Sequence, residues 1–322
     1  MAEAAELAAS EEQGYSSVLA CVEARASRLF DLLGQLQGDD DVELVHDVRV
    51  ASRRLAEGLG AARPALDAEG LTSFKTWLRE RRALLGPTRD ADVMALVLTK
   101  LVGGEEKLVA IPAGVSFVEM LRARRQTQLE HARSQLPATE VHERRDALTE
   151  MMSGASPSGQ AETSEAASAD ASDEDAHLDE ALARRARRRV RRRRSAFTKL
   201  ARKAAKSSRP GALHAARIAC KKLRYALELA NECRLLDGSR ELKRLQGLQE
   251  RLGELNDLTV LRDELRRFAE QTGMDEILSL TERRRREPVK GFAKTWPKAA
   301  RRLRKAKARR LSRELAPALV DA

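Results

Sequence analysis

The sequence predicts an all-α protein of two pseudo-symmetric helical bundles, a tandem repeat of a four-helix-type unit around a basic central groove or pore. Leu, Ala, Arg and Glu dominate its 322 residues, which is typical of helical proteins. Apolar residues recur at helical spacing, and no alternating strand pattern occurs. Two sequence blocks return at nearly the same offset, which indicates a duplicated unit of several helices.

The first repeated block is His46–Leu55, and its copy begins 168 residues later at His214. Both copies read His-x-x-Arg-aliphatic-Ala-x-basic-basic-Leu. A second block, LGPTRDADV at 85–93, is matched by LGELNDLTV at 252–260, at an offset of 167. Two matched blocks at almost one offset predict that the second half of the chain repeats the helices of the first.

The first half is predicted to be a bundle over residues 14–152, preceded by a disordered leader at 1–13. Gly38 to Asp41 separates the first two helices and offers an N-cap, and Gly or Pro pairs mark most of the later boundaries. The expected helices cover about 15–37, 42–61, 67–85, 89–102, 112–136 and 138–152.

Residues 153–176 are rich in Ser, Ala and acidic residues and hold almost no large apolar side chain, so we expect a disordered linker there. A second bundle is predicted over 177–313. Pro210 suits the first turn of a helix, and Gly253 is expected to end one. The expected helices cover about 177–206, 211–232, 238–252 and 255–272, and then 275 to the end with interruptions near Pro288 and Pro297.

The charge balance predicts a polyanionic partner. The chain has 60 Lys and Arg against 49 Asp and Glu, a net charge of +11. Aromatic residues make up only 3%, which disfavours stacking of single-stranded nucleic acid. The three Cys residues form no C-x-x-C pair, so we expect no disulfide framework, no metal site and no cofactor. No apolar run is long enough for a membrane span and no signal peptide is apparent, so a cytoplasmic location is expected.

On a helical wheel, each copy of the first block has an apolar face and a cationic face. His46, Arg49 and Arg53 share one side of the first helix, and Val48 and Leu55 lie opposite. The second cationic face holds His214, Arg217, Lys221 and Tyr225, flanked by Lys222 and Arg224. If the two faces meet across one groove, Arg forks and Lys charges at one-turn spacing suit a linear chain of phosphates.

Each of these features also has a simpler interpretation. A charged helix face is usually only solvated, and either His can hydrogen-bond a neighbouring helix. Nine of the eleven residues from Arg184 to Arg194 are Arg; they form a solvated run, or a further wall of the anion site through Arg188 and Arg191. The carboxylates at 90, 92 and 257 favour helix capping or pairing with Arg over a metal site.

The segments VHDVRVASRRL, LHAARIACKKLRYALEL and RDADV resemble the CHAD family, the conserved histidine alpha-helical domain. The resemblance covers about residues 14–310 and implies one domain of two pseudo-symmetric bundles around a basic cavity that binds inorganic polyphosphate. It also implies localisation to polyphosphate granules. The first copy departs from the second, with Ala56-Glu57 in place of Arg224-Tyr225. The binding residues carried over by motif position are His46, Arg49, Arg53, Arg54, His214, Arg217, Lys221, Lys222, Arg224 and Tyr225.

The preferred function is therefore polyphosphate binding without catalysis. A nucleic-acid-binding basic helical protein is the main alternative, because that function also needs basic helices, and weak nonspecific nucleic acid is the corresponding second partner. A metal-dependent phosphohydrolase is a second alternative, suggested by the dipeptide His46-Asp47. That chemistry needs further His and Asp ligands, and no His precedes position 46. No Walker-type loop or nucleophile elbow appears, and no oligomeric state is predicted.

Overall fold

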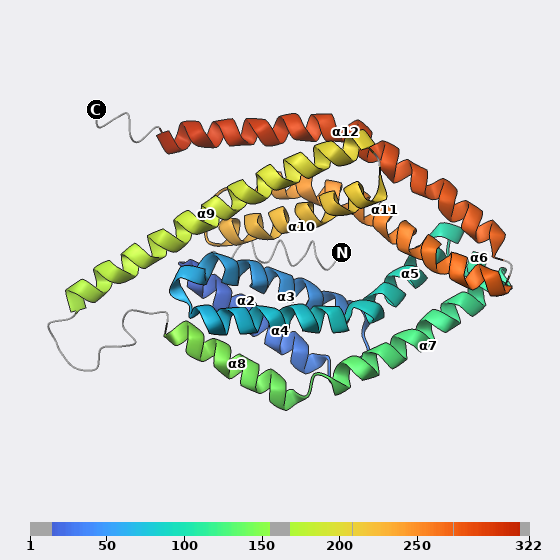
Figure 1. Ribbon diagram of the computed structural model, residues 1–322, viewed down its shortest axis with the longest axis horizontal. Coiled ribbons are helices and arrows are strands. Elements are labelled where there is room, and N and C mark those ends of the chain that lie inside the picture. The colour runs from blue at the N-terminus through green and yellow to red at the C-terminus, as the bar shows by residue number, and fades with distance from the viewer. Residues whose placement is uncertain (1–14, 155–167, 208, 273, 316–322) are drawn as a thin grey trace.

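A computed structural model describes the backbone of residues 15–154, 168–207, 209–272 and 274–315. Side chains are described for 15–154, 176–207, 209–268 and 274–301. All regular elements in these ranges are helices, so the all-α prediction is confirmed (Figure 1). The predicted leader at 1–13 and most of the predicted linker lie outside the described residues.

The first half follows the predicted boundaries closely. Asp41 and Asp67 cap the second and third helices by accepting hydrogen bonds from the backbone amides of Glu43 and Gly70. Gly103 ends another helix at a φ of 95°, a conformation that favours Gly. The elements are α2 (Val18–Gln35), α3 (Val42–Ala62), η1 (Arg63–Ala65), α4 (Ala68–Leu84), α5 (Gly86–Val102), α6 (Glu105–Val109), α7 (Pro112–Ser134) and α8 (Ala138–Ser153).

The second half has four long helices: α9 (Ser168–Ser207), α10 (Pro210–Glu232), α11 (Ser239–Thr272) and α12 (Asp275–Leu315). Pro210 opens α10 as predicted. The linker prediction is wrong over 168–176, where α9 has already begun. The sequence offers a reason, because Asp and Glu are concentrated at 170–175 and acidic residues favour the first turns of a helix.

Three predicted helix breaks are wrong. α11 continues through Gly253, because the buried Leu252 and Leu255 on either side hold it against its neighbours. A Gly inside a helix costs only about 1 kcal/mol, which such packing offsets. α12 likewise continues through Pro288 and Pro297, where the buried Phe292 and Trp296 anchor it in the core.

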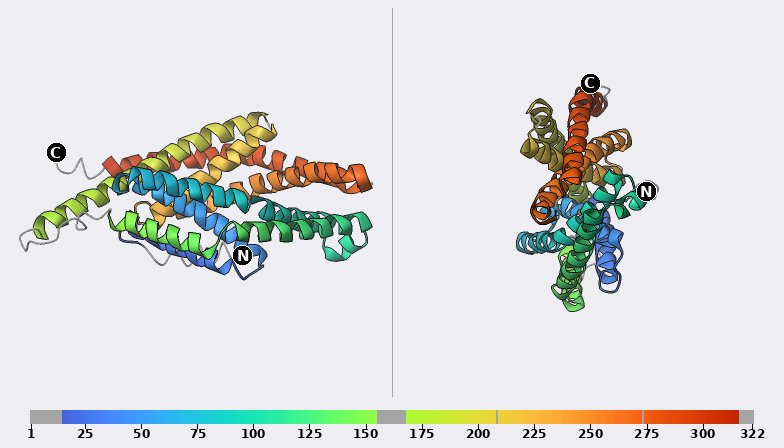
Figure 2. Two further views of the ribbon diagram at one scale, coloured as in Figure 1. Left: turned by 60° about the horizontal axis from the view of Figure 1, so that its bottom comes forward. Right: turned by 90° about the vertical axis from the view of Figure 1, so that its right-hand side faces the viewer.

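Three apolar clusters hold the helices together. The first joins α2, α3, α4 and α8 around Phe30, Phe74 and Trp77, and the second joins α9 to α12 around Phe197 and Trp296. The third joins α5 and α7 to α11 and α12 around Phe117, and it was not predicted. It lies at one end of the elongated molecule, where helices from both halves extend side by side (Figure 2).

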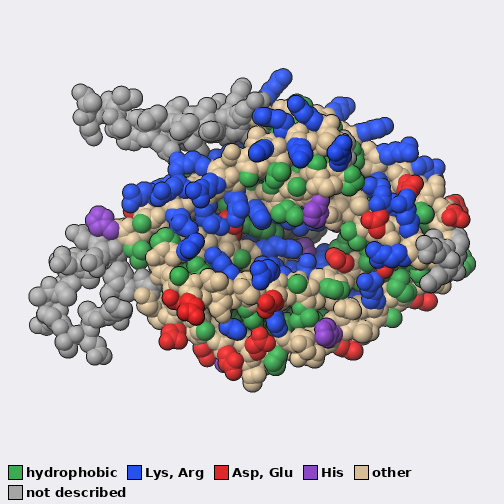
Figure 3. Space-filling view, in the orientation of Figure 1, with side chains coloured by type: hydrophobic (Ala, Val, Ile, Leu, Met, Phe, Trp, Pro, Cys, Tyr) green, Lys and Arg blue, Asp and Glu red, His purple; other side chains and the backbone are tan. Residues whose placement is uncertain are grey.

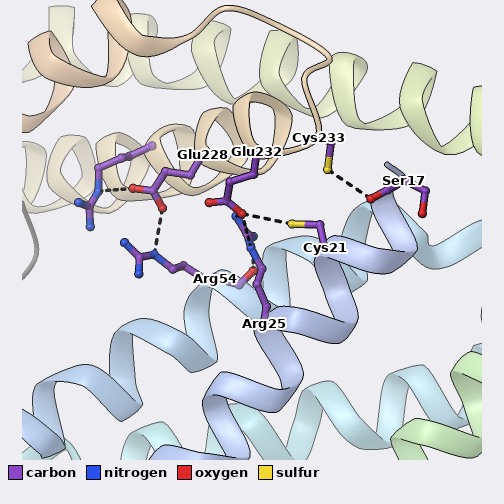
Figure 4. A network of polar contacts seen from close by, with 8 residues as sticks. Ser17, Cys21, Arg25, Arg54, Glu228, Glu232 and Cys233 are labelled. Carbon is purple, nitrogen blue, oxygen red and sulfur yellow. Dashed lines mark hydrogen bonds and ion pairs between the residues drawn. The ribbon is translucent and has the colours of Figure 1, made fainter. Parts of the chain in front are cut away.

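Near the middle of the molecule, α3 packs against α10 and α5 packs against α11. Largely buried ion pairs join both α2 and α3 to α10. Arg25 on α2 lies 2.9 Å from Glu232, and Arg54 on α3 lies 3.2 Å from Glu228, with both acids on α10 (Figure 4). Among the described residues, no helix is long and apolar enough to cross a membrane.

Candidate functional site

A cavity of about 300 Å³ lies among α3, α5, α10 and α11. Helices α3 and α10 present their cationic faces to it, as the helical wheels predicted. Figure 3 shows a hollow near the middle of the molecule, with Lys and Arg side chains around it. The residues that line the cavity are His46, Arg49, Arg53, Arg89, Asp90, Val93, Arg217, Lys221, Gln249, Glu250, Gly253, Glu254, Asn256, Asp257 and Val260.

Matched positions of the repeated blocks meet in this cavity. Arg49 and Arg217 correspond in the first block, and both line it. Arg53 and Lys221 are a second such pair. In the second block, Asp90 corresponds to Asp257, and again both line the cavity. The two repeats therefore contribute equivalent side chains to one site.

The cations of the cavity are close to one another and partly buried, and both effects lower the pKa values of Lys221 and Arg49. Burial, together with the charges of Arg217 and Arg53, lowers the pKa of Lys221 to about 7. Burial and the charge of Arg53 lower the pKa of Arg49 to about 10. The free site thus holds more positive charge than its surroundings stabilise, which is the electrostatic condition for binding an anion.

The opposite wall of the cavity is acidic. Glu250, Glu254 and Asp257 line it from α11, and Asp90 lines it from α5. Asp257 lies 3.6 Å from Arg217. Burial and the nearby Asp257 raise the pKa of Asp90. A polyanion in this cavity is therefore attracted to the side formed by α3 and α10 and repelled from the side formed by α11.

Two of the three carboxylates singled out in the second block pair with Arg, which is one of the two interpretations favoured above. Asp92 lies 2.6 Å from Arg125 on α7, and Asp257 pairs with Arg217. Neither caps a helix, because α5 begins at Gly86 and α11 continues through this region. Within the described side chains, no group of three or more His, Cys, Asp or Glu is placed to hold a metal ion.

Five of the binding residues predicted from the repeated motif do not line the cavity. Arg54 and Arg224 both pair with Glu228, at 3.2 and 3.5 Å, and Arg224 is buried. Tyr225 is buried beside Arg224, whose guanidinium lies 5.1 Å from the ring centre. His214 is exposed and hydrogen-bonds Asn256 at the cavity edge, at 3.0 Å, and Lys222 points to solvent.

Sequence reasoning missed two cations near the site. Arg89 lies in the second block, so the repeat itself was a signal for it. Arg82 comes from α4 and donates a hydrogen bond to the Ser52 carbonyl at 3.2 Å. Burial and the charge of Arg53 lower the pKa of Arg82 to about 10. The matched position of Arg82 in the second half is Gln249, so the repeat carried no signal for it.

The Arg-rich run of α9 does not form a wall of the central cavity, which corrects the prediction for Arg188 and Arg191. Arg188 lines a separate pocket of about 400 Å³ on α9, together with Arg185, Arg189, Arg192 and Arg193. Arg191 is exposed and lines neither space. Arg193 lines this pocket and pairs with Glu57 at 3.2 Å.

The chain is similar to known proteins in both sequence and fold. The family model of the CHAD domain matches residues 20–266. No curated protein matches the chain. Among solved structures, the crystal structure of the CHAD domain from the plant Ricinus communis is 21% identical, with a TM-score of 0.57 over 91% of this chain and 92% of that one. PptA from Streptomyces chartreusis is 15% identical, with a TM-score of 0.58 over 88% of this chain and 99% of that one.

Proposed function

Because the chain belongs to the CHAD domain family, we propose that it binds inorganic polyphosphate in the cavity among α3, α5, α10 and α11. The observation that carries this proposal is the convergence of Arg49, Arg53, Arg217 and Lys221 in one partly enclosed space. Guanidinium groups grip pairs of phosphate oxygens, and burial strengthens each contact.

The electrostatics favour an extended phosphate chain over a compact anion. The side chains that α3 presents to the cavity, His46, Arg49 and Arg53, follow one another at about one-turn spacing. The acids of α11 line the other side, so a bound chain lies along α3 and α10. Arg54 and Arg224 already hold Glu228, and in this proposal they support the wall without contacting phosphate.

The proposed activity is binding without hydrolysis. His46 lines the central cavity, whereas the neighbouring Asp47 lines a different pocket beside Arg25 and Arg54. The His-Asp dipeptide thus presents its two side chains to different spaces. A phosphohydrolase would need both near one phosphate, so this geometry favours a binding role for His46.

Polyphosphate binding would bring the protein to the polyphosphate granules of the cytoplasm, which we propose as its location. Fluorescently tagged protein in cells that store polyphosphate should co-localise with the granules. In cells that make no polyphosphate, the signal should become diffuse. Granule-like foci that persist in such cells would contradict this part of the proposal.

The central test is a set of equilibrium titrations with long-chain polyphosphate, duplex DNA and ATP at matched phosphate concentration. Polyphosphate should bind most tightly, and its affinity should fall steeply with salt because binding releases counterions. If duplex DNA displaces bound polyphosphate at comparable phosphate concentration, the nucleic-acid alternative is correct. Release of phosphate during the titration, abolished by His46→Ala, would support the hydrolase alternative.

A further inference from the structure

We propose that the arginine pocket on α9 is a second phosphate-binding site, and that one polyphosphate chain occupies it and the central cavity together. This inference rests on the proposed function and extends it, because it predicts where the polyphosphate chain runs on the protein and how long the chain must be to reach both sites. The α9 pocket is lined by Arg185, Arg188, Arg189, Arg192, Arg193 and Ala196.

Three of these arginines are held in place by α3, and the first, Arg185, donates to the Gly60 carbonyl at 3.2 Å. Arg189 donates to Glu57 at 2.9 Å and to the Gly60 carbonyl at 3.2 Å, and Arg193 donates to the other oxygen of Glu57 at 3.2 Å. A Cβ at position 60 would lie only 2.5–2.9 Å from atoms of the Arg189 guanidinium. Gly60 therefore allows this close approach. The α9 pocket is thus held by the C-terminal end of α3, whereas His46 lies near the N-terminal end of the same helix.

The other arginines are placed to bind a ligand. Arg188 and Arg192 line the pocket and are exposed, and no hydrogen bond or ion pair joins them to other described side chains. Glu57 is the one acidic side chain seen to pair with arginines of the pocket in the described residues, and it faces two of them. The pocket therefore keeps a strong excess of positive charge for an anion to neutralise.

A row of cations on α4 connects the two sites. Lys75, Arg79 and Arg82 are spaced four and three residues apart, so they share one face of that helix. Arg82 lies near Arg53 at the central cavity. At the other end, burial and the charge of Arg189 lower the pKa of Lys75 to about 8. Figure 3 shows Lys and Arg side chains continuing between α9 and α4 to the central hollow.

The spacing of the sites selects a linear polyanion. On α3, Arg49 lies at the central cavity and Gly60 lies at the α9 pocket. These positions are eleven residues apart, so the two sites are separated by about 16 Å along the helix at 1.5 Å per residue. A compact anion or tripolyphosphate fills one site, whereas a long polyphosphate chain reaches both. Binding at the second site is then intramolecular, so the affinity should rise with chain length until both sites are occupied.

The test compares two double variants of α9 with the wild-type protein. Arg188→Gln with Arg192→Gln removes two charges from the pocket. Arg191→Gln with Arg202→Gln removes the same charge from exposed positions of the same helix that line neither site. Each protein is titrated with tripolyphosphate and with long-chain polyphosphate at several salt concentrations.

We expect the pocket variant to lose about tenfold or more in affinity for long-chain polyphosphate and to show a shallower salt dependence. Its affinity for tripolyphosphate should match wild type, because the central cavity is intact. The control variant should stay within about twofold of wild type for both ligands, since distant exposed charges are screened.

Unchanged long-chain affinity in the pocket variant would overturn the second site while leaving the proposed function standing. Failure of the wild-type protein to bind polyphosphate of any length would instead overturn the proposed function. If the pocket variant lost duplex DNA binding but kept polyphosphate binding, the pocket would serve nucleic acid and this inference would be wrong.

Discussion

Arg25 on α2 donates hydrogen bonds from Nε and Nη2 to the same oxygen of Glu232 on α10, at 3.1 and 2.9 Å. Both side chains are largely buried, and they join residues 207 positions apart. Arg25 also donates to the Arg54 carbonyl at 2.8 Å, so the guanidinium links α2, α3 and α10. This contact fastens the first half of the chain to the helix that supplies Arg217 and Lys221 to the cavity.

We expect Glu232→Gln to destabilise the protein by about 3–5 kcal/mol, since it leaves Arg25 buried without its counter-charge. Urea unfolding followed by circular dichroism measures the change. The matched control is Arg266→Gln, which breaks the exposed pair with Glu282 and should cost about 1 kcal/mol or less. Equal effects of the two substitutions would contradict this role for Arg25 and Glu232.

The same pair predicts how stability depends on pH. Burial opposes ionisation of Glu232, but the charge of Arg25 and the hydrogen bonds from Cys21 and Arg25 together outweigh it, so the pKa of the folded-state carboxyl lies below its usual value. The carboxylate thus stabilises the fold above its unfolded-state pKa, and this contribution disappears as the pH falls through the folded-state pKa. The difference in unfolding free energy between wild type and Glu232→Gln should shrink in acid, as measured from pH 7 to pH 3.

Arg53→Ala with Lys221→Ala should weaken polyphosphate binding strongly and leave helicity intact. Each lost charge-assisted hydrogen bond costs about 1.5–3 kcal/mol, which is about tenfold or more in affinity. Lys222→Ala is the matched control, because Lys222 is adjacent in the motif but points to solvent. If Lys222→Ala weakened polyphosphate binding as much as the double variant does, the affinity would not depend on lining the cavity, and the assignment of the cavity as the binding site would be wrong.

Polyphosphate binding should be accompanied by proton uptake between about pH 7 and 9. The pKa of Lys221 is about 7 in the free protein because of burial and the charges of Arg217 and Arg53, and a bound anion favours the charged amine. Affinity should therefore fall as the pH rises through this range. Calorimetry in buffers of different ionisation enthalpy measures the uptake, and Lys221→Arg, which stays charged, should abolish the part due to this residue.

Glu57→Gln should strengthen binding of long-chain polyphosphate while weakening the fold. The substitution removes the negative charge that Arg189 and Arg193 share, so the α9 pocket gains net positive charge. Loss of hydrogen bonds to a charged group should cost about 1–3 kcal/mol in unfolding free energy. Titration and thermal unfolding of the same sample check both effects. A fall in affinity would show that Glu57 acts by positioning the arginines.

The helices were predictable because their apolar spacing and their Gly, Pro and Asp boundaries are local. Gly253, Pro288 and Pro297 misled the prediction, because packing of Leu252, Leu255, Phe292 and Trp296 outweighs what those residues do to an isolated helix. The third apolar cluster also escaped prediction. It combines residues from both halves, such as Phe117 and Phe268, which no single stretch of sequence places together.

The site was predictable only in part, because the repeat is visible in the sequence whereas partners distant along the chain are not. The repeat identified Arg49, Arg53, Arg217 and Lys221, because each half carries the same pattern. The partner of Arg54 lies 174 residues away, so its pairing with Glu228 was invisible in the sequence. The partner of Arg224 was visible, since Glu228 follows it by four residues on the same helix. That spacing was the available sign that Arg224 is engaged within the protein.

The uninterrupted α11 makes the two sides of the cavity mechanically unequal. One side is a single helix that crosses from the second apolar cluster to the third. The matching segment of the first half is two helices, α4 and α5, which meet at Leu85 and Gly86. Backbone hydrogen bonds along a continuous helix resist bending more than a junction of two helices does. We therefore expect any change in the width of the cavity to occur at the joint between α4 and α5, with α11 as its fixed side.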